Sequence, residues 1–269
     1  MNSIIKIYQP ILYMVLFAVV FTSCEKEIDV ELRSVEPRIV IEGIIKKDSL
    51  ATVRVSKTLD FSNNEGYPFL KGAIVTITDN EGNTEVLPQD ETGWYTAINM
   101  KGVERRTYNL SVVYEGEEYK ATSTMPPHVN LDSLAMVKVL AMDYAFPEIY
   151  FKDPVGTENQ YYRALLFING KQHHDMSEFV RSAEFMDGRE FVQFIPVMTH
   201  DDDNDPYEKG DELTVEFQCI DKSAYTFFYT LSRIENDLTN PISNVSNGAL
   251  GYFSACTSQR KSIIADWED

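Results

Sequence analysis

The sequence has few of the residues from which catalytic centres are usually built. Its 269 residues include four His, three Cys and two Trp. A Gly-x-Ser-x-Gly nucleophile elbow, a His-Glu-x-x-His zinc pair and a glycine-rich phosphate loop are all missing from it. His173 and His174 are adjacent, and adjacent residues of a strand point to opposite faces, so they make a poor pair of ligands for one metal ion. We therefore predict a protein without enzymatic activity.

Basic residues are scarce as well. Lys and Arg number 24 against 42 Asp and Glu, which gives a formal net charge of −18. A field of that sign repels nucleic acid and anionic lipid headgroups, so we expect no nucleic-acid partner. Solubility is the simplest use of this charge, and cationic ligands or divalent ions are the alternatives.

Long apolar runs are absent beyond the N-terminus. The longest run, residues 11–21, has the length of the apolar part of an export signal and falls short of the ~20 residues that span a membrane. Lys6 precedes it, and Phe21-Thr22-Ser23-Cys24 follows, which resembles the bacterial lipobox. We predict that residues 1–23 are a signal peptide, that Cys24 is lipidated, and that residues 24–37 form a tether. An ordinary signal peptide with an incidental Cys is the alternative.

Lipid on Cys24 would decide where the protein works. Each buried CH₂ contributes ~0.8 kcal/mol, so several acyl chains would hold the mature chain durably at a membrane. Residues 25–29 are mostly acidic and resemble the export tag that sends some Bacteroidota lipoproteins to the outer face of the outer membrane. We expect an outer-membrane lipoprotein at the cell surface, with a plain solvated tether as the other interpretation of this stretch.

The remaining cysteines form an even pair. If Cys24 is lipidated, Cys219 and Cys256 are left in an oxidising compartment. A disulfide bond between them would stabilise the fold by roughly 3–4 kcal/mol. Two separate buried thiols are the alternative.

The residue pattern predicts a mainly β fold. Alternating apolar and polar residues indicate seven short strands in an Ig-like sandwich over residues 38–127, and Pro126-Pro127 marks a boundary. These strands are expected at residues 39–45, 51–56, 73–78, 84–87, 93–97, 108–114 and 118–124. Residues 79–83 are expected to form a hairpin turn between the third and the fourth strand. A second β-rich domain is predicted over residues 128–269, with strands at 133–142, 149–152, 161–168, 191–196, 212–220 and 248–255. It also carries one amphipathic helix, at about 221–239, with Asp221 or Ser223 as its N-cap.

An acidic run is the best candidate for a metal site. Asp201, Asp203, Asp205 and Glu212 occupy positions 1, 3, 5 and 12 of a loop like that of an EF-hand, and a hard cation such as Ca²⁺ prefers oxygen ligands. Position 6 is Pro206, where the calcium loop needs glycine for its sharp turn. A solvated loop is therefore the alternative, and otherwise we expect no cofactor.

Aromatic residues offer a further surface. Tyr67 and Phe69 lie in a Gly/Pro loop and could contact a sugar or a peptide, whereas Trp94 is expected to pack in the core.

Several segments carry a family resemblance. Residues 70–77, Gly93-Trp94-Tyr95 and residues 108–110 resemble the carboxypeptidase-regulatory-like or transthyretin-like β-sandwich. The order of further segments resembles the domain of unknown function 4249 family of Bacteroidota lipoproteins. These segments are residues 151–154, 159–163, 186–191, 207–213 and 248–253. That resemblance implies an outer-membrane lipoprotein associated with a TonB-dependent transporter, and it implies no known ligand or reaction. Asp48-Ser49-Leu50 and Asp132-Ser133-Leu134 resemble the O-glycosylation signal of exported Bacteroidota proteins, with a plain turn or strand start as the alternative.

Three functions follow from these features. The first is a lipid-anchored, non-enzymatic accessory or binding module that works with a TonB-dependent transporter in nutrient uptake. The second is a structural or adhesion module of the envelope. The third is a surface hydrolase that uses the acidic run, for which Asp203 would be the residue to test.

Overall fold

The structure is a computed structural model that describes residues 36–59, 69–138, 145–157, 160–173, 179–195, 197, 206–237 and 239–267. The chain divides into a unit of residues 1–35, which lies outside the described residues, and a compact unit of residues 36–269. The predicted signal peptide and Cys24 therefore lie outside the described part. Among the described residues, the helices are too short to cross a membrane.

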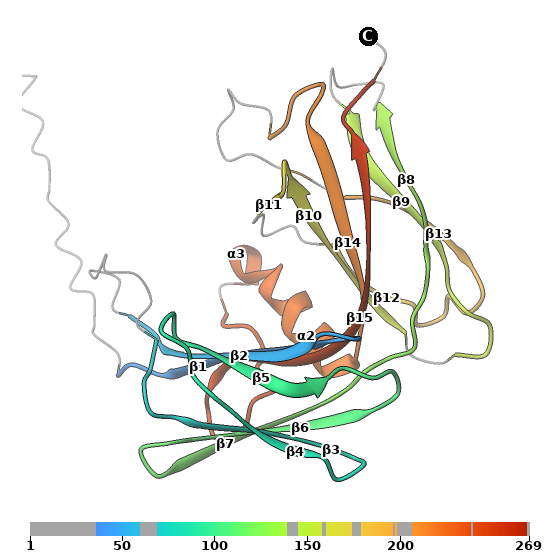
Figure 1. Ribbon diagram of the computed structural model, residues 1–269. Helices are drawn as coiled ribbons and strands as arrows, with labels where there is room; N and C mark the ends of the chain where they lie inside the picture. The colour runs from blue at the N-terminus through green and yellow to red at the C-terminus, as the bar shows by residue number, and fades with distance from the viewer. Residues whose placement is uncertain are drawn as a thin grey trace, which may run out of the picture. The chain divides into compact units, whose positions relative to one another are not determined.

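The N-terminal half is a two-sheet β-sandwich, as predicted. Its strands are β1 (Ile39–Lys46), β2 (Leu50–Lys57), β3 (Ile74–Asp79), β4 (Thr84–Leu87), β5 (Trp94–Lys101), β6 (Thr107–Tyr114) and β7 (Glu117–Thr124). One sheet contains β1, β2 and β5, and the other has the order β4-β3-β6-β7 (Figure 1). Alternate residues such as Ile41, Val53 and Ile77 point into the space between the sheets and are fully buried. The period-two pattern of the sequence is thus the pattern of this core.

The C-terminal half is a second pair of facing sheets. Its elements are β8 (Leu131–Lys138), β9 (Ala145–Lys152), β10 (Tyr161–Ile168), β11 (Lys171–Gln172), β12 (Phe179–Ser182), β13 (Glu190–Phe194), β14 (Glu212–Ile220), α2 (Lys222–Leu231), α3 (Ile234–Asp237) and β15 (Leu250–Ile264). The sheet β13-β9-β8 packs on β10, β14 and the end of β15. The rings of Phe151, Tyr162 and Phe217 meet there at centroid distances of 4.6–5.3 Å. The prediction of a mainly β fold is confirmed.

One strand belongs to both halves. The first part of β15, residues 250–256, pairs in parallel with β1, and residues 257–264 pair antiparallel with β14. The result is an eight-stranded sheet with the order β11-β10-β14-β15-β1-β2-β5, to which β12 adds by pairing with β10. The sequence predicted separate domains over residues 38–127 and 128–269. In the structure the C-terminal strand enters the N-terminal sheet, and residues 36–269 form one compact unit.

Helix α2 covers the face of this sheet that is opposite to the two cores. Asp221 caps it as predicted, since its carboxylate accepts a hydrogen bond from the Ala224 N–H at 2.9 Å. Ala224, Phe227 and Phe228 are its buried residues. The structure divides the predicted helix of about 221–239 into two pieces, because α2 ends at residue 231 and the short helix α3 follows at Ile234–Asp237. The hydroxyl of Thr230 bonds to backbone carbonyls one turn back, a contact that weakens helices.

The predicted disulfide bond is wrong. Cys219 and Cys256 are both free and buried. In the ladder of β14 and β15, Cys219 lies opposite Thr257, so the preceding residue, Cys256, points to the other face of the sheet. One thiol packs in the C-terminal core and the other packs beneath α2. Burial raises the pKa of Cys219 to about 11 and that of Cys256 to about 12, so both are inert thiols at neutral pH.

A buried ion cluster lies where the two halves meet. Glu216 of β14 is 1% exposed. It accepts a bond from Lys46 of β1, bonds at 2.8 and 2.6 Å from Arg260 of β15, and a bond at 2.7 Å from Gln218. Burial alone would raise the pKa of Glu216, and the bonds from Lys46 and its neighbours outweigh that effect and lower the pKa. The carboxylate is therefore ionised and links three strands.

Candidate functional site

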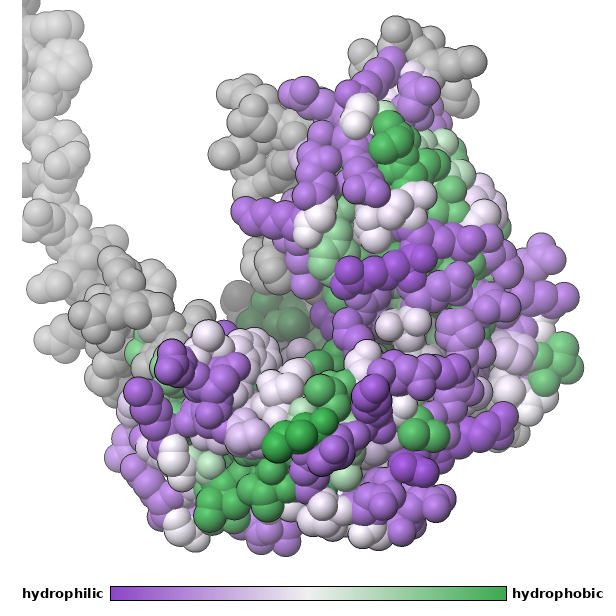
Figure 2. All heavy atoms as spheres, viewed as in Figure 1, coloured by the Kyte–Doolittle hydropathy of each residue, from purple (hydrophilic) through white to green (hydrophobic). Residues whose placement is uncertain are grey.

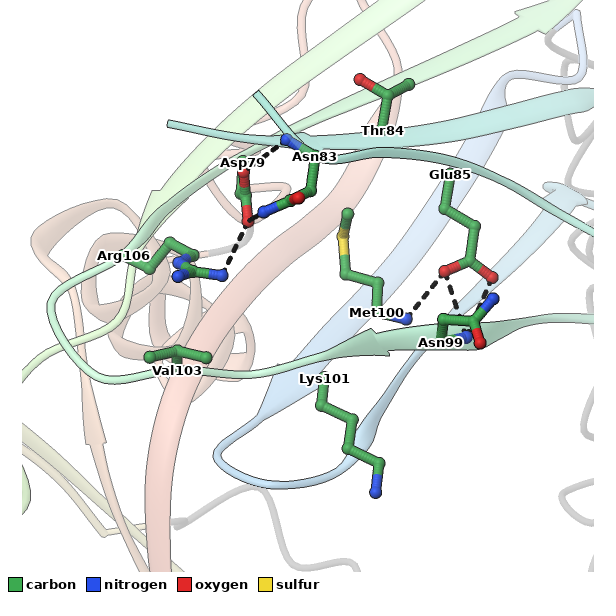
Figure 3. Close-up of a pocket in the computed structure, with 9 residues that line it drawn as sticks. All are labelled: Asp79, Asn83, Thr84, Glu85, Asn99, Met100, Lys101, Val103 and Arg106. Carbon is green, nitrogen blue, oxygen red and sulfur yellow. Dashed lines mark hydrogen bonds and ion pairs between the residues drawn. The ribbon is translucent and has the colours of Figure 1, made fainter. Parts of the chain in front are cut away.

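A pocket of about 410 Å³ opens in the N-terminal half, between the β3–β4 hairpin and the segment that joins β5 to β6 (Figure 3). Its volume falls within the range of small-molecule sites. It is lined by Asp79, Asn83, Thr84, Glu85, Asn99, Met100, Lys101, Val103 and Arg106. The face of the sandwich that Figure 2 shows is partly apolar, and Ile74, Val86 and Ile98 of the sandwich are 57%, 59% and 67% exposed.

Asp79 forms one wall of the pocket, at the end of β3. Its Oδ1 accepts the backbone N–H groups of Glu81 and Asn83 at 3.0 and 2.9 Å, which shapes the hairpin turn. Its Oδ2 accepts from Asn83 Nδ2 at 2.8 Å and from Arg106 Nη1 at 2.9 Å. Burial pushes the pKa of Asp79 up, and these four bonds outweigh it and leave the pKa below its ordinary value.

Glu85 forms the opposite wall, on β4. The pairing of β2 with β5 shifts register after Leu50, so part of β5 leaves the ladder as an irregular bulge. The Glu85 carboxylate accepts hydrogen bonds from the backbone N–H groups of this bulge: from Ile98, from Asn99 at 3.2 Å and from Met100 at 2.7 Å. These bonds outweigh the effect of burial and lower the pKa of Glu85. The side chain therefore joins the edge strands of the two sheets.

This arrangement decides what the pocket can do. An ionised carboxylate has about four acceptor positions, and the bonds just described occupy them on both Asp79 and Glu85. The lowered pKa values keep both groups ionised, so neither is placed to exchange protons with a ligand at neutral pH. The donors of Arg106 and the amide of Asn99 remain for a ligand.

The predicted calcium loop is only partly visible. Asp201, Asp203 and Asp205 lie outside the described residues. Glu212 is the exposed first residue of β14, and its backbone N–H donates to Asn169 Oδ1 at 3.0 Å. No group of three potential metal ligands occurs within the described part of the chain.

The structure describes one of the two residues predicted to make aromatic contacts. Tyr67 lies outside the described residues, and Phe69 packs against the backbone of Gly93. The prediction that Trp94 packs in the core is wrong. Trp94 is 37% exposed on the outer face of its sheet, and the Arg54 guanidinium lies 5.8 Å from the centre of its ring. His174 lies outside the described part, and His173 follows β11.

The two predicted O-glycosylation serines are accessible. Ser49 lies in the exposed turn between β1 and β2, and Ser133 is exposed on β8. Their modification stays a prediction. Sequence reasoning missed the pocket, although it identified residues 79–83 as a hairpin turn. The contact between Glu85 and β5 joins residues thirteen or more positions apart, and no local pattern marks it.

Comparisons with known proteins agree with one part of the prediction. A protein family described as Domain of unknown function (DUF4249) matches residues 25–262. No curated protein matches the chain. Among solved structures, a chain described as "Cytokine receptor complex - Crystal form 1A" is similar over 82% of this chain and 94% of its own length, with 8% identity and a TM-score of 0.27.

Proposed function

This chain belongs to the domain of unknown function 4249 family, and we propose that it is an outer-membrane lipoprotein that binds a ligand without converting it. In this proposal it works at the cell surface beside a TonB-dependent transporter in nutrient uptake. The observation that carries the binding role is the pocket in which both carboxylates, Asp79 and Glu85, are ionised and fully engaged by N–H donors. Because neither carboxylate is left free to act as a general acid or base, the site suits the holding of a ligand better than its conversion.

The sequence supports the proposed location at a membrane. An apolar segment of signal length ends at Phe21-Thr22-Ser23-Cys24, and acyl chains on Cys24 would hold the mature chain at a bilayer. Glu36, the first described residue, follows Cys24 by twelve positions. Such a stretch reaches ~40 Å when fully extended. The sandwich that carries the pocket would therefore stay close to a membrane-embedded partner.

Metabolic labelling with radioactive palmitate tests the anchor. We expect the wild-type chain to take up label, Cys24→Ser to take up none, and the matched control Cys219→Ala to keep the label. Equal labelling of the wild type and Cys24→Ser would show that the lipid is elsewhere or absent. The proposed location would then fail.

Crosslinking in intact outer membranes tests the partner. We expect mild solubilisation after crosslinking to recover a TonB-dependent barrel with the wild-type chain, and much less of it with Cys24→Ser, which lacks the tether. Recovery of surface-appendage proteins without a barrel would contradict the transport role and would favour the structural or adhesion alternative.

A further inference from the structure

The pocket has spare hydrogen-bond donors and few spare acceptors. A guanidinium carries five N–H donors, and among the described residues the one side-chain partner of Arg106 is Asp79. The Asn99 side chain is exposed, and Glu85 engages only its backbone N–H. Because Asp79 and Glu85 are already saturated, a ligand that suits this pocket must bring acceptors.

The charges that line the pocket are balanced, so the pocket repels an anion less than the acidic chain as a whole does. Its lining contains two acids, Asp79 and Glu85, and two bases, Lys101 and Arg106, whereas the whole chain carries −18. An anion therefore meets no excess negative charge from the lining itself. In Figure 3 the Lys101 side chain points away from the Asp79–Arg106 pair, which leaves Arg106 as the cation of that wall.

The remaining lining suits a hydroxylated body. The Met100 side chain lies between the two walls in Figure 3 and is 8% exposed, and Val103 is 43% exposed. These groups form an apolar surface for C–H groups. The amides of Asn83 and Asn99 can both donate to and accept from hydroxyl groups.

We propose that this pocket binds a small carboxylate that also carries hydroxyl groups. Arg106 holds the carboxylate, Asn83 and Asn99 hold hydroxyl groups, and Met100 contacts the C–H face. The inference rests on the proposed function only in that the pocket binds a ligand without converting it.

Calorimetric titration of the full chain in detergent tests the ligand class. The probes are D-glucuronate and D-glucose, which share a ring and differ in the carboxylate, and inorganic phosphate serves as a competitor. We expect glucuronate to bind at least about tenfold more tightly than glucose, because a charge-assisted bond to Arg106 is lost with glucose. Phosphate should compete poorly, because it lacks the hydroxylated body.

Paired variants place the binding in this pocket. Arg106→Gln should weaken glucuronate binding by at least about tenfold. Its control, Arg105→Gln, makes the same change in net charge one residue away. Asn99→Ala should weaken binding by about threefold or more, and it removes a side chain without an intramolecular partner in the described structure. Its control is Asn109→Ala on the outer face of β6.

Four results would overturn the inference. These are equal binding of glucuronate and glucose, no glucuronate binding up to about 10 mM, equal losses in variants and controls, and displacement by phosphate at matching concentrations. Should Arg106→Gln fail to fold, Asn99→Ala decides the question alone. The palmitate label and the crosslinked barrel do not depend on the pocket, so loss of glucuronate binding with both intact refutes this ligand without refuting the proposed function.

Discussion

Glu85 offers the sharpest test of how the pocket is built. Removal of its carboxylate by Glu85→Ala leaves the N–H groups of Ile98, Asn99 and Met100 without their acceptor. Hydrogen bonds to a charged group contribute roughly 1.5–3 kcal/mol each when buried. Glu85 is partly exposed, so water replaces much of this, and we expect a total loss of about 1–2 kcal/mol. For a unit of this size the melting temperature should fall by about 2–8 °C.

The matched control is Glu81→Ala, in the same hairpin. It removes the same charge, and the contact of Glu81 with Asp79 is made by its backbone N–H. Its effect should stay within about 0.5 kcal/mol. Urea denaturation of both variants at pH 7 and pH 3.5 measures the difference. Because the pKa of Glu85 is lowered in the fold, its contribution is present above its ordinary value of 4.5 and is lost as the pH falls through the folded-state value. Equal stability of the two variants at pH 7 would refute the role given to Glu85.

Three further predictions address the rest of the fold. Burial raises the pKa of Asp153 in the folded state. The stabilising contribution of Asp153 is therefore present below the ordinary pKa of 3.8 and is lost as the pH rises through the folded-state pKa. Asp153→Asn should therefore raise the urea midpoint more at pH 7 than at pH 4. Cys219 and Cys256 should react with a thiol reagent only after denaturation, without added reductant, and protection by a disulfide in denaturant would contradict the free thiols. Gly251→Ala places a Cβ 2.0 Å from a β1 carbonyl oxygen at a φ of +95°, and a thermal melt should show that it lowers the free energy of unfolding by more than about 3 kcal/mol. Gly248→Ala is its control: the residue has a φ of +71° and no atom within 4 Å of the added Cβ, so the loss should be about 1 kcal/mol.

Local patterns predicted most of the strands because those strands bury one face. In β2, residues alternate between the core and the opposite face, and the same alternation is visible in the sequence. The second part of β15 was missed for the opposite reason. Its residues 257–264 include Thr257, Ser258, Arg260 and Lys261, and this polar stretch is a strand because it pairs with β14, about forty residues earlier.

The same distinction explains the sites. The Asp79 turn is local, so its sequence predicted it correctly, whereas the bonds between Glu85 and β5 depend on tertiary structure. The disulfide was predicted from the even number of cysteines left beside Cys24 and from the oxidising compartment that export implies. Its failure follows from the register of two strands, which composition does not contain.

The shared strand gives the buried ion cluster a role beyond stability. A buried ion pair is weak support for stability, because the charges lose their hydration. It does specify the pairing register of β14 and β15. A slip of one residue between these strands would carry Glu216 to the opposite face of the sheet, away from Lys46 and Arg260. The same strand pairs with β1, which begins directly after the predicted tether. The register that this cluster specifies therefore joins the C-terminal half to the sandwich that carries the pocket, and the two cannot be separated at residue 127 without opening a continuous sheet.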